Sequence, residues 1–89
     1  MEFEWDPQKA QANLAKHGIT FSEAATVFGG PLALTYFDPD HASDEDRYLT
    51  FGTTAQGNLV LVVHTDRGDK TRLITARRMT SRERDQYER

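Results

Sequence analysis

The stretch that decides the fold is WDPQKAQANLAKHGITFSEAATVF, residues 5–28. Asp6 can cap a helix whose first turn begins at Pro7, where a missing backbone N–H costs nothing. Gly18 can adopt the left-handed conformation that ends a helix. The spacing therefore predicts a helix over residues 7–17.

A second helix is expected directly after this glycine. Thr20 and Glu23 have the spacing of a capping box, and Ile19 stands where it can pack on Ala24 as a hydrophobic staple. The apolar pattern predicts a mostly buried helix over residues 21–28, which a Gly-Gly-Pro sequence then ends.

The rest of the chain is dominated by strand signals. Phe3 and Trp5 alternate with acidic residues, which predicts a short edge strand with its aromatic side chains turned inward. Short turns at residues 55–58 and 66–69 favour antiparallel neighbours. The further strands are expected at residues 32–37, 47–54, 59–64 and 71–76. A long acidic loop is expected at residues 38–46.

A last helix is expected over residues 82–89, capped by Thr80 or Ser81, with Met79 and Tyr87 as its apolar anchors. These elements predict an α+β fold in one domain, residues 1–89. Two N-terminal helices and one C-terminal helix pack on a mostly antiparallel sheet of about four strands.

Composition limits the class of protein. The chain has 89 residues and no cysteine, so neither disulfides nor cysteine-ligated zinc hold it together. Its N-terminus is acidic, and no apolar run reaches the ~20 residues of a membrane span. We expect a cytoplasmic protein with no membrane partner.

Charge is distributed unevenly along the chain. The net charge of −3 divides into −7 for residues 1–46 and +4 for residues 47–89. Such asymmetry is typical either of a local anion site on an acidic body or of a solvated mixed surface.

Three arginines are candidates for that anion site. Arg47 begins one meander strand, whereas Arg77 and Arg78 end another, and we expect these strand ends at one edge of the sheet. A guanidinium fits phosphate oxygens and stabilises charge that develops on them. The alternatives are ion pairs of Arg77 and Arg78 with Glu83 or the acidic loop, and of Arg47 with the acids at residues 44–46.

The first predicted helix carries a polar stripe. At about 100° per residue, Lys9, Asn13, Lys16 and His17 fall within one quadrant. His17 has the side chain that exchanges protons near neutral pH, although a histidine in the last helical turn also simply favours the helix dipole. If this helix lies across the sheet edge, its stripe faces the arginines.

The other titratable residues have weaker functional readings. His64 is expected to be a satisfied core residue. His41 follows Asp38 and Asp40, a group that could hold a divalent cation or remain solvated. Tyr87 either anchors the last helix or presents its phenol to a ligand.

The ordered set of residues resembles the BrnT toxins of bacterial type II toxin-antitoxin systems. The match spans nearly the whole chain. It consists of Phe3, Trp5, Asp6, Lys9, Asn13, Lys16, His17, Gly18, Ile19, Phe21, Ala24, Val27, Phe28, Asp38, His41, Glu45, Arg47, Gly52, Arg72, Ile74, Ala76, Arg77, Glu83 and Tyr87.

This resemblance implies a RelE-like fold and a ribonuclease that inhibits translation by cutting RNA, including mRNA on the ribosome. It also implies a BrnA-like antitoxin, with operator DNA bound only through the toxin-antitoxin complex. The implied cleavage needs no metal or other cofactor, because the 2′-OH attacks the adjacent phosphate.

On this reading, the catalytic candidates are His17, Arg47, Arg77, Glu83 and Tyr87, and Lys9, Lys16 and Arg78 bind RNA. His17 transfers a proton, and Glu83 and Tyr87 are reserve candidates. The competing reading is a non-enzymatic protein-binding module or co-repressor, which the acidic N-terminal half and the polar last helix also suit.

Overall fold

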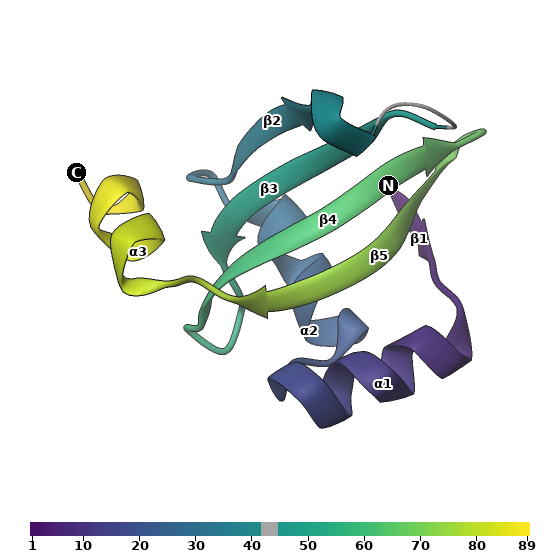
Figure 1. The fold of residues 1–89 in the computed structure, drawn as a ribbon, viewed down its shortest axis with the longest axis horizontal. Helices are drawn as coiled ribbons and strands as arrows, with labels where there is room; N and C mark the ends of the chain where they lie inside the picture. Colours follow the sequence, from purple (N-terminus) through teal and green to yellow (C-terminus); the bar gives the residue numbers. More distant parts are fainter. Residues whose placement is uncertain (42–44) are drawn as a thin grey trace.

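The chain folds into a five-stranded sheet with three α-helices, as the computed structural model of residues 1–41 and 45–89 shows (Figure 1). The strands are β1 (Glu2–Glu4), β2 (Leu34–Asp38), β3 (Arg47–Thr53), β4 (Leu59–Arg67) and β5 (Lys70–Arg78). The α-helices are α1 (Pro7–His17), α2 (Phe21–Ala25) and α3 (Ser81–Tyr87), and short 3₁₀ helices lie at η1 (Thr26–Gly29) and η2 (Pro39–His41). The expected α+β class is confirmed.

The sheet order is β1-β5-β4-β3-β2. The pairs β2–β3, β3–β4 and β4–β5 are antiparallel, as predicted, whereas β1 pairs in parallel with β5, Phe3 lying opposite Thr71. The expected number of about four strands is therefore too low. The N-terminal segment joins the sheet as a fifth, edge strand and makes the sheet mixed.

Helix α1 has the predicted bounds because both of its ends are set locally. The Asp6 carboxylate accepts from the N–H groups of Gln8 (2.8 Å) and Lys9 (3.4 Å). Gly18 has φ 71°, and its N–H donates to the carbonyl of Leu14 at 2.9 Å. A left-handed backbone of this kind favours glycine.

The second helix is shorter than predicted and continues as η1. Thr20 caps it as expected, accepting from the N–H of Glu23 at 3.0 Å. The Glu23 carboxylate, expected to complete a capping box, is directed instead to the β3–β4 turn, where it accepts from Thr54 Oγ1 (2.8 Å) and Asn58 Nδ2 (2.6 Å). Donors that are distant in the sequence, Thr54 and Asn58, therefore take the carboxylate that would have completed the local cap.

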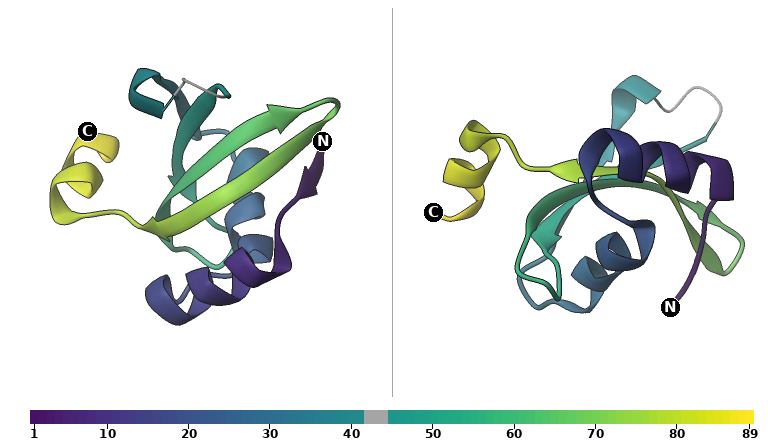
Figure 2. Two further views of the ribbon diagram at one scale, coloured as in Figure 1. Left: turned by 45° about the vertical axis from the view of Figure 1, so that its right-hand side comes forward. Right: turned by 90° about the horizontal axis from the view of Figure 1, so that it is seen from below.

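One face of the sheet holds the hydrophobic core, covered by α2 and η1, which lie behind the sheet in Figure 1 (see also Figure 2). The buried cluster is Ile19, Phe21, Ala24, Val27, Val60, Val62, Leu73 and Ala76. Gly52 is required by close packing, because a Cβ placed there would lie 3.0 Å from the Cβ of Val27. The expectation that Phe3 and Trp5 turn inward is confirmed, since both pack against this cluster.

His64 lies in the core, as expected, but only one of its ring nitrogens is satisfied. Nε2 lies 2.7 Å from Thr50 Oγ1, which in turn lies 2.7 Å from Thr35 Oγ1. Nδ1 is buried without a partner in the described part of the chain. Burial lowers the pKa of His64, which favours the neutral imidazole that can occupy this position.

The opposite face of the sheet is not covered by a helix in Figure 1. Apolar side chains in register on β2 to β4 line it: Leu34, Phe51 and Leu61 form one row, and Tyr36, Leu49 and Val63 form the next. Helix α3 lies beyond the end of β5 and has no buried residue (Figures 1 and 2). None of the helices in residues 1–41 and 45–89 combines the length and apolarity that a membrane crossing demands.

Candidate functional site

The candidate site is built where α1 meets the edge of β5. Strand β1 covers this edge only at residues 70–72, so beyond them the backbone of β5 has no strand neighbour on that side in the described part of the chain. Asn13 of α1 occupies the gap. Its Nδ2 donates to the carbonyl of Ala76 (2.8 Å), and its Oδ1 accepts from the N–H of Ala76 (3.0 Å).

The same amide makes two further bonds. Nδ2 donates to the carbonyl of Ile19 (3.0 Å), and Oδ1 accepts from Thr75 Oγ1 (3.0 Å). A side-chain amide has two donors and one two-lone-pair acceptor, so every bond that Asn13 can make is made. Asn13 therefore replaces a missing β-strand, and it is buried rather than a member of the solvated stripe that the sequence predicted.

The other stripe residues surround this clamp and remain accessible. Lys9, Lys16 and His17 line a shallow hollow of about 220 Å³ together with Ile74 and Thr75 of β5. Helix α1 thus places its cationic stripe beside the edge of β5, as hypothesised from the sequence. That the stripe faces the arginines stays a prediction.

Arg77 continues this surface along β5. Thr75 and Arg77 alternate with Ala76, so their side chains lie on one face of the strand, about 7 Å apart by strand geometry. This is the face of the sheet opposite the core, because Thr75 lies opposite Val63 and Arg77 lies opposite Leu61. Arg77 therefore shares a face of β5 with Thr75, which lines the hollow beside Lys9, Lys16 and His17.

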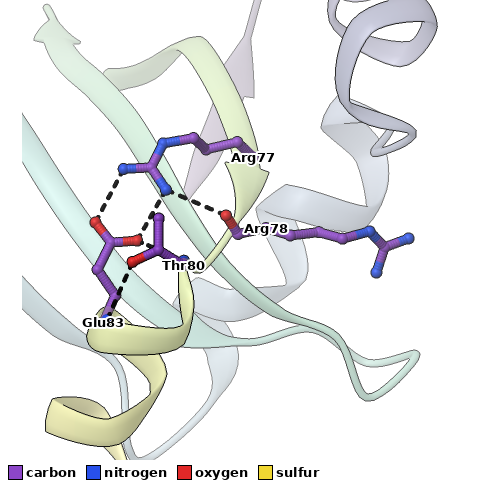
Figure 3. A network of polar contacts seen from close by, with 4 residues as sticks. All are labelled: Arg77, Arg78, Thr80 and Glu83. Carbon is purple, nitrogen blue, oxygen red and sulfur yellow. Dashed lines mark hydrogen bonds and ion pairs between the residues drawn. The ribbon is translucent and has the colours of Figure 1, made fainter.

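Arg77 is held by the first turn of α3 (Figure 3). Its Nη1 and Nη2 donate to the two carboxylate oxygens of Glu83 at 2.8 and 2.9 Å, and Nη1 also donates to the carbonyl of Arg78 at 3.1 Å. Thr80 and Glu83 form a reciprocal capping box, which fixes the carboxylate. The ion pair with Glu83, one alternative left open by the sequence, is present.

The pair shifts both ionisation equilibria. Hydrogen bonds from Arg77, with smaller contributions from Thr80, lower the pKa of Glu83 to about 2. The hydrogen bond to Glu83 raises the pKa of Arg77 above its ordinary value. Glu83 is therefore a carboxylate at neutral pH, suited to holding a cation and poorly suited to giving up a proton.

This pair makes stability depend on pH. Because the pKa of Glu83 is 4.5 when unperturbed and about 2 in the fold, its contribution is present above about pH 4.5 and is lost as the pH falls toward 2. We expect denaturant unfolding to show wild type more stable than Glu83→Gln at pH 7, with the difference shrinking below pH 4.5. An exposed control, Asp85→Asn, is expected to show no such pH-dependent gap, and a constant gap for Glu83→Gln would contradict the assignment.

Arg78 points away from Arg77 and Glu83, to the other side of the strand (Figure 3). Its Nη1 donates to Asn58 Oδ1 at 2.8 Å, and it lines a hollow with Met79, Arg84 and the β3–β4 turn. Arg78 and Arg84 together form a second cationic surface at this end of the sheet. Within residues 1–41 and 45–89, Arg78 makes this amide contact in place of the acidic partner that the sequence offered as an alternative.

Arg47 lies at the opposite end of the sheet, so the expected gathering of three arginines is wrong. Tyr48, the next residue, is opposite His64, whereas Arg77 is opposite Leu61. Because β3 and β5 are both antiparallel to β4, they run in the same direction. The first residue of β3, Arg47, therefore lies at the opposite end of the sheet from the last residues of β5. Strand dimensions put the two residues about 16 Å apart.

The local surroundings of Arg47 are acidic. It pairs with Asp38 across the β2–β3 ladder, and its Nε lies 3.8 Å from Glu45 Oε1. The expected pairing with residue 44 lies outside the described residues.

Tyr87 anchors α3 to the turn before β2. Its hydroxyl donates to the carbonyl of Leu32 at 3.0 Å. The phenol also borders a hollow of about 140 Å³ between α3 and the sheet, lined by Leu34, Tyr36, Phe51, Glu83, Gln86 and Tyr87. Tyr87 therefore anchors α3, as one of the two alternatives from the sequence expected. The edge of its phenol ring that borders the hollow is open to a ligand.

Two polar residues of this region were missed by the sequence analysis. Thr75 holds Asn13 and lines the His17 hollow, and Asn58 links Arg78 to Glu23. Alternation along residues 71–78 would have placed Thr75 and Arg77 on one face. No local signal identifies Asn58, because its partners are distant in the sequence.

The acidic-loop metal site stays a prediction. Within residues 1–41 and 45–89, no group of three or more His, Asp or Glu side chains is placed to hold a metal. The side chain of His41, which that hypothesis needs, lies outside the described part of the structure.

Together, the fold and this surface define a class: a small α+β protein, with three helices on a mixed sheet, that presents cations and an imidazole along one sheet edge. The chain belongs to the BrnT family, since the family model described as ribonuclease toxin, BrnT, of type II toxin-antitoxin system matches residues 5–83. Such a family implies an antitoxin partner.

A solved structure agrees with this assignment at the level of the fold. The chain is similar to the 1.1 Å crystal structure of the Brucella abortus ribonuclease toxin BrnT, with a TM-score of 0.67 and 23% sequence identity over 91% of this chain and 99% of that one. No curated protein sequence matches the chain.

Proposed function

We propose that this chain is a metal-independent endoribonuclease toxin that inhibits translation and is neutralised by a BrnA-like antitoxin. Family membership supports ribonuclease activity. The observation that carries the proposal is the edge formed by Lys9, Lys16 and His17 around the Asn13 clamp, whose Thr75 shares a strand face with Arg77. Operator DNA is bound only by the toxin-antitoxin complex.

The proposed reaction breaks one phosphodiester bond and forms another. A base removes the proton of a ribose 2′-OH, O2′ bonds to the adjacent phosphorus, and the bond from phosphorus to O5′ breaks as that oxygen gains a proton. The products are a 2′,3′-cyclic phosphate and a 5′-OH. The reaction requires proton transfer and fixed positive charge near the phosphate, both of which side chains can supply.

His17 is the residue we assign to proton transfer, because it is half-buried in a hollow lined by two lysines. Lys9 and Lys16 bind flanking phosphates as point charges. Arg77 stabilises the charge on the phosphate at the scissile bond. A guanidinium has five N–H donors, so Arg77 can keep its three bonds to Glu83 and Arg78 and still donate to a phosphate oxygen.

The remaining candidates receive roles that follow from their positions. Glu83 holds Arg77, and Tyr87 borders the hollow beside them. Arg78 contacts the RNA backbone on the far side of β5. Arg47, about 16 Å from Arg77 by strand geometry, binds a phosphate several nucleotides away rather than the scissile one.

Analysis of cleavage products tests the proposal. Purified chain incubated with RNA in excess chelator is expected to yield 2′,3′-cyclic phosphate and 5′-OH ends. Products with 5′-phosphates, or cleavage that requires an added divalent cation, would contradict the mechanism. Expression of the active chain is expected to arrest growth.

Salt dependence tests which lysines bind RNA. Lys16→Ala is expected to weaken RNA binding and to reduce the slope of log K against log salt by about 0.7, the value for one single-strand phosphate contact. Lys70→Ala is the matched control, because Lys70 is an exposed lysine at the opposite end of β5. Equal effects of the two substitutions would mean that Lys16 contributes only to the net charge of the protein and makes no phosphate contact of its own, which would contradict its assignment.

A further inference from the structure

Exposed apolar side chains are concentrated in one short segment. Six large hydrophobic residues are exposed in the described part of the chain, and four of them lie within residues 32–37. These four are Leu32 (71% exposed), Leu34 (45%), Tyr36 (53%) and Phe37 (49%). Single exposed apolar residues are normal on protein surfaces, but a contiguous group marks an interaction site.

This segment includes an open sheet edge. Strand β2 is the last in the sheet order and pairs only with β3 in the described residues, so its outer backbone groups have no strand partner. It reads Leu-Thr-Tyr-Phe-Asp, with no charge before Asp38 and no proline. Protected edges usually carry charges, prolines or bulges, whereas an apolar edge accepts an added strand.

The exposed side chains lie on both faces of β2. Leu34 and Tyr36 lie on the face away from α2, opposite Phe51 and Leu49, where they line the hollow beside α3. Phe37 lies on the other face, with its ring 5.8 Å from that of Tyr48. A strand added beside β2 would cover both faces at once, which a helix laid on one face would not.

Charge indicates the kind of partner. The chain continues from the end of β2 into acidic residues, and Asp40 and Asp46 are both exposed there. A complementary partner segment therefore has apolar residues at alternate positions where it lies beside β2, and lysine or arginine where it passes these carboxylates. A second copy of this chain would bring another net charge of −3 to the contact.

We propose that β2 is the docking strand of the antitoxin, which adds an extended, basic-ended segment to the sheet at Leu34–Asp38. This proposal rests on the proposed function, because it takes its partner from the toxin-antitoxin assignment. The geometry specifies the contact: backbone bonds to the outer edge of β2, with Leu32 and Phe37 covered.

The test uses the cognate BrnA-like antitoxin, produced together with the chain. Phe37→Glu is expected to weaken the complex at least about 30-fold, as expected for a residue at the centre of an interface. Leu14→Glu is the matched control, since Leu14 is 48% exposed on α1, and it is expected to leave affinity within about threefold. Equal losses from the two substitutions would overturn the proposal.

Hydrogen exchange reports the added strand directly. The outward amides of residues 34–38 are expected to exchange rapidly in the free chain and to become protected in the complex. If they stay unprotected, no strand adds to β2. Leu32→Glu, in the turn outside the strand, provides a second variant with no change to the sheet, and its affinity is expected to fall as well.

The two proposals fail in distinguishable ways. Phe37→Glu is expected to cleave RNA like wild type while escaping inhibition by the antitoxin, so loss of cleavage would place β2 in the substrate site and overturn the docking assignment. A wild-type chain that binds antitoxin through β2 but leaves RNA intact would overturn only the nuclease. If the chain alone forms dimers and Phe37→Glu dissociates them, β2 binds a second copy of the chain instead of the antitoxin, and the docking assignment is overturned.

Discussion

Replacing Asn13 by alanine is expected to lower the free energy of unfolding by about 3 kcal/mol. The substitution leaves the buried N–H and carbonyl of Ala76 without partners, and each such group costs about 1–3 kcal/mol. The carbonyl of Ile19 loses its bond as well. A loss of this size is a large share of the total stability of a small domain.

The measurement is denaturant unfolding with amide exchange as a second readout. Gln11→Ala is the matched control, because it removes an exposed amide from the same helix and is expected to change stability by less than about 0.5 kcal/mol. The Ala76 amide is expected to lose protection in Asn13→Ala. A loss below about 1 kcal/mol would show that the Asn13 clamp does not hold α1 to β5.

The parts of the fold that follow from the sequence are those set by neighbouring residues. Helix α1 depends on Asp6 and Gly18, whose partners lie within four positions of them. The meander follows from short turns, which leave two strands no other arrangement. The parallel pairing of β1 with β5 joins residues 68 positions apart, such as Glu4 and Arg72, and no local pattern specifies it.

The candidate site was only partly predictable, because periodicity shows which residues share a face but not what that face meets. Asn13 belongs to the polar stripe of α1, yet it meets backbone groups of a sheet edge instead of water. Glu23 has the spacing of a cap, but Thr54 and Asn58 compete for its carboxylate. The separation of Arg47 from Arg77 differs in kind, since the direction of three successive antiparallel strands already excludes their meeting.

Replacing His17 by alanine is expected to lower RNA cleavage by about 10²- to 10⁴-fold, the usual contribution of a positioned proton-transfer group. Because His17 also lies in the last turn of α1, the substitution is expected to cost only about 0.3–1 kcal/mol of stability. The fold therefore persists, and the loss is expected in kcat. Lys16→Ala, in the same hollow, is expected to raise KM with little change in kcat.

Cleavage kinetics measured on folded variants separate the two readings of His17. A small loss of stability with unchanged cleavage would leave His17 as a helix-end residue and would move proton transfer to Tyr87, whose phenol borders the hollow beside Arg77 and Glu83. His17→Ala is expected to bind the antitoxin like wild type, whereas Phe37→Glu is expected to show the reverse. Opposite defects in the two variants would assign catalysis and neutralisation to separate edges of one sheet, β5 and β2.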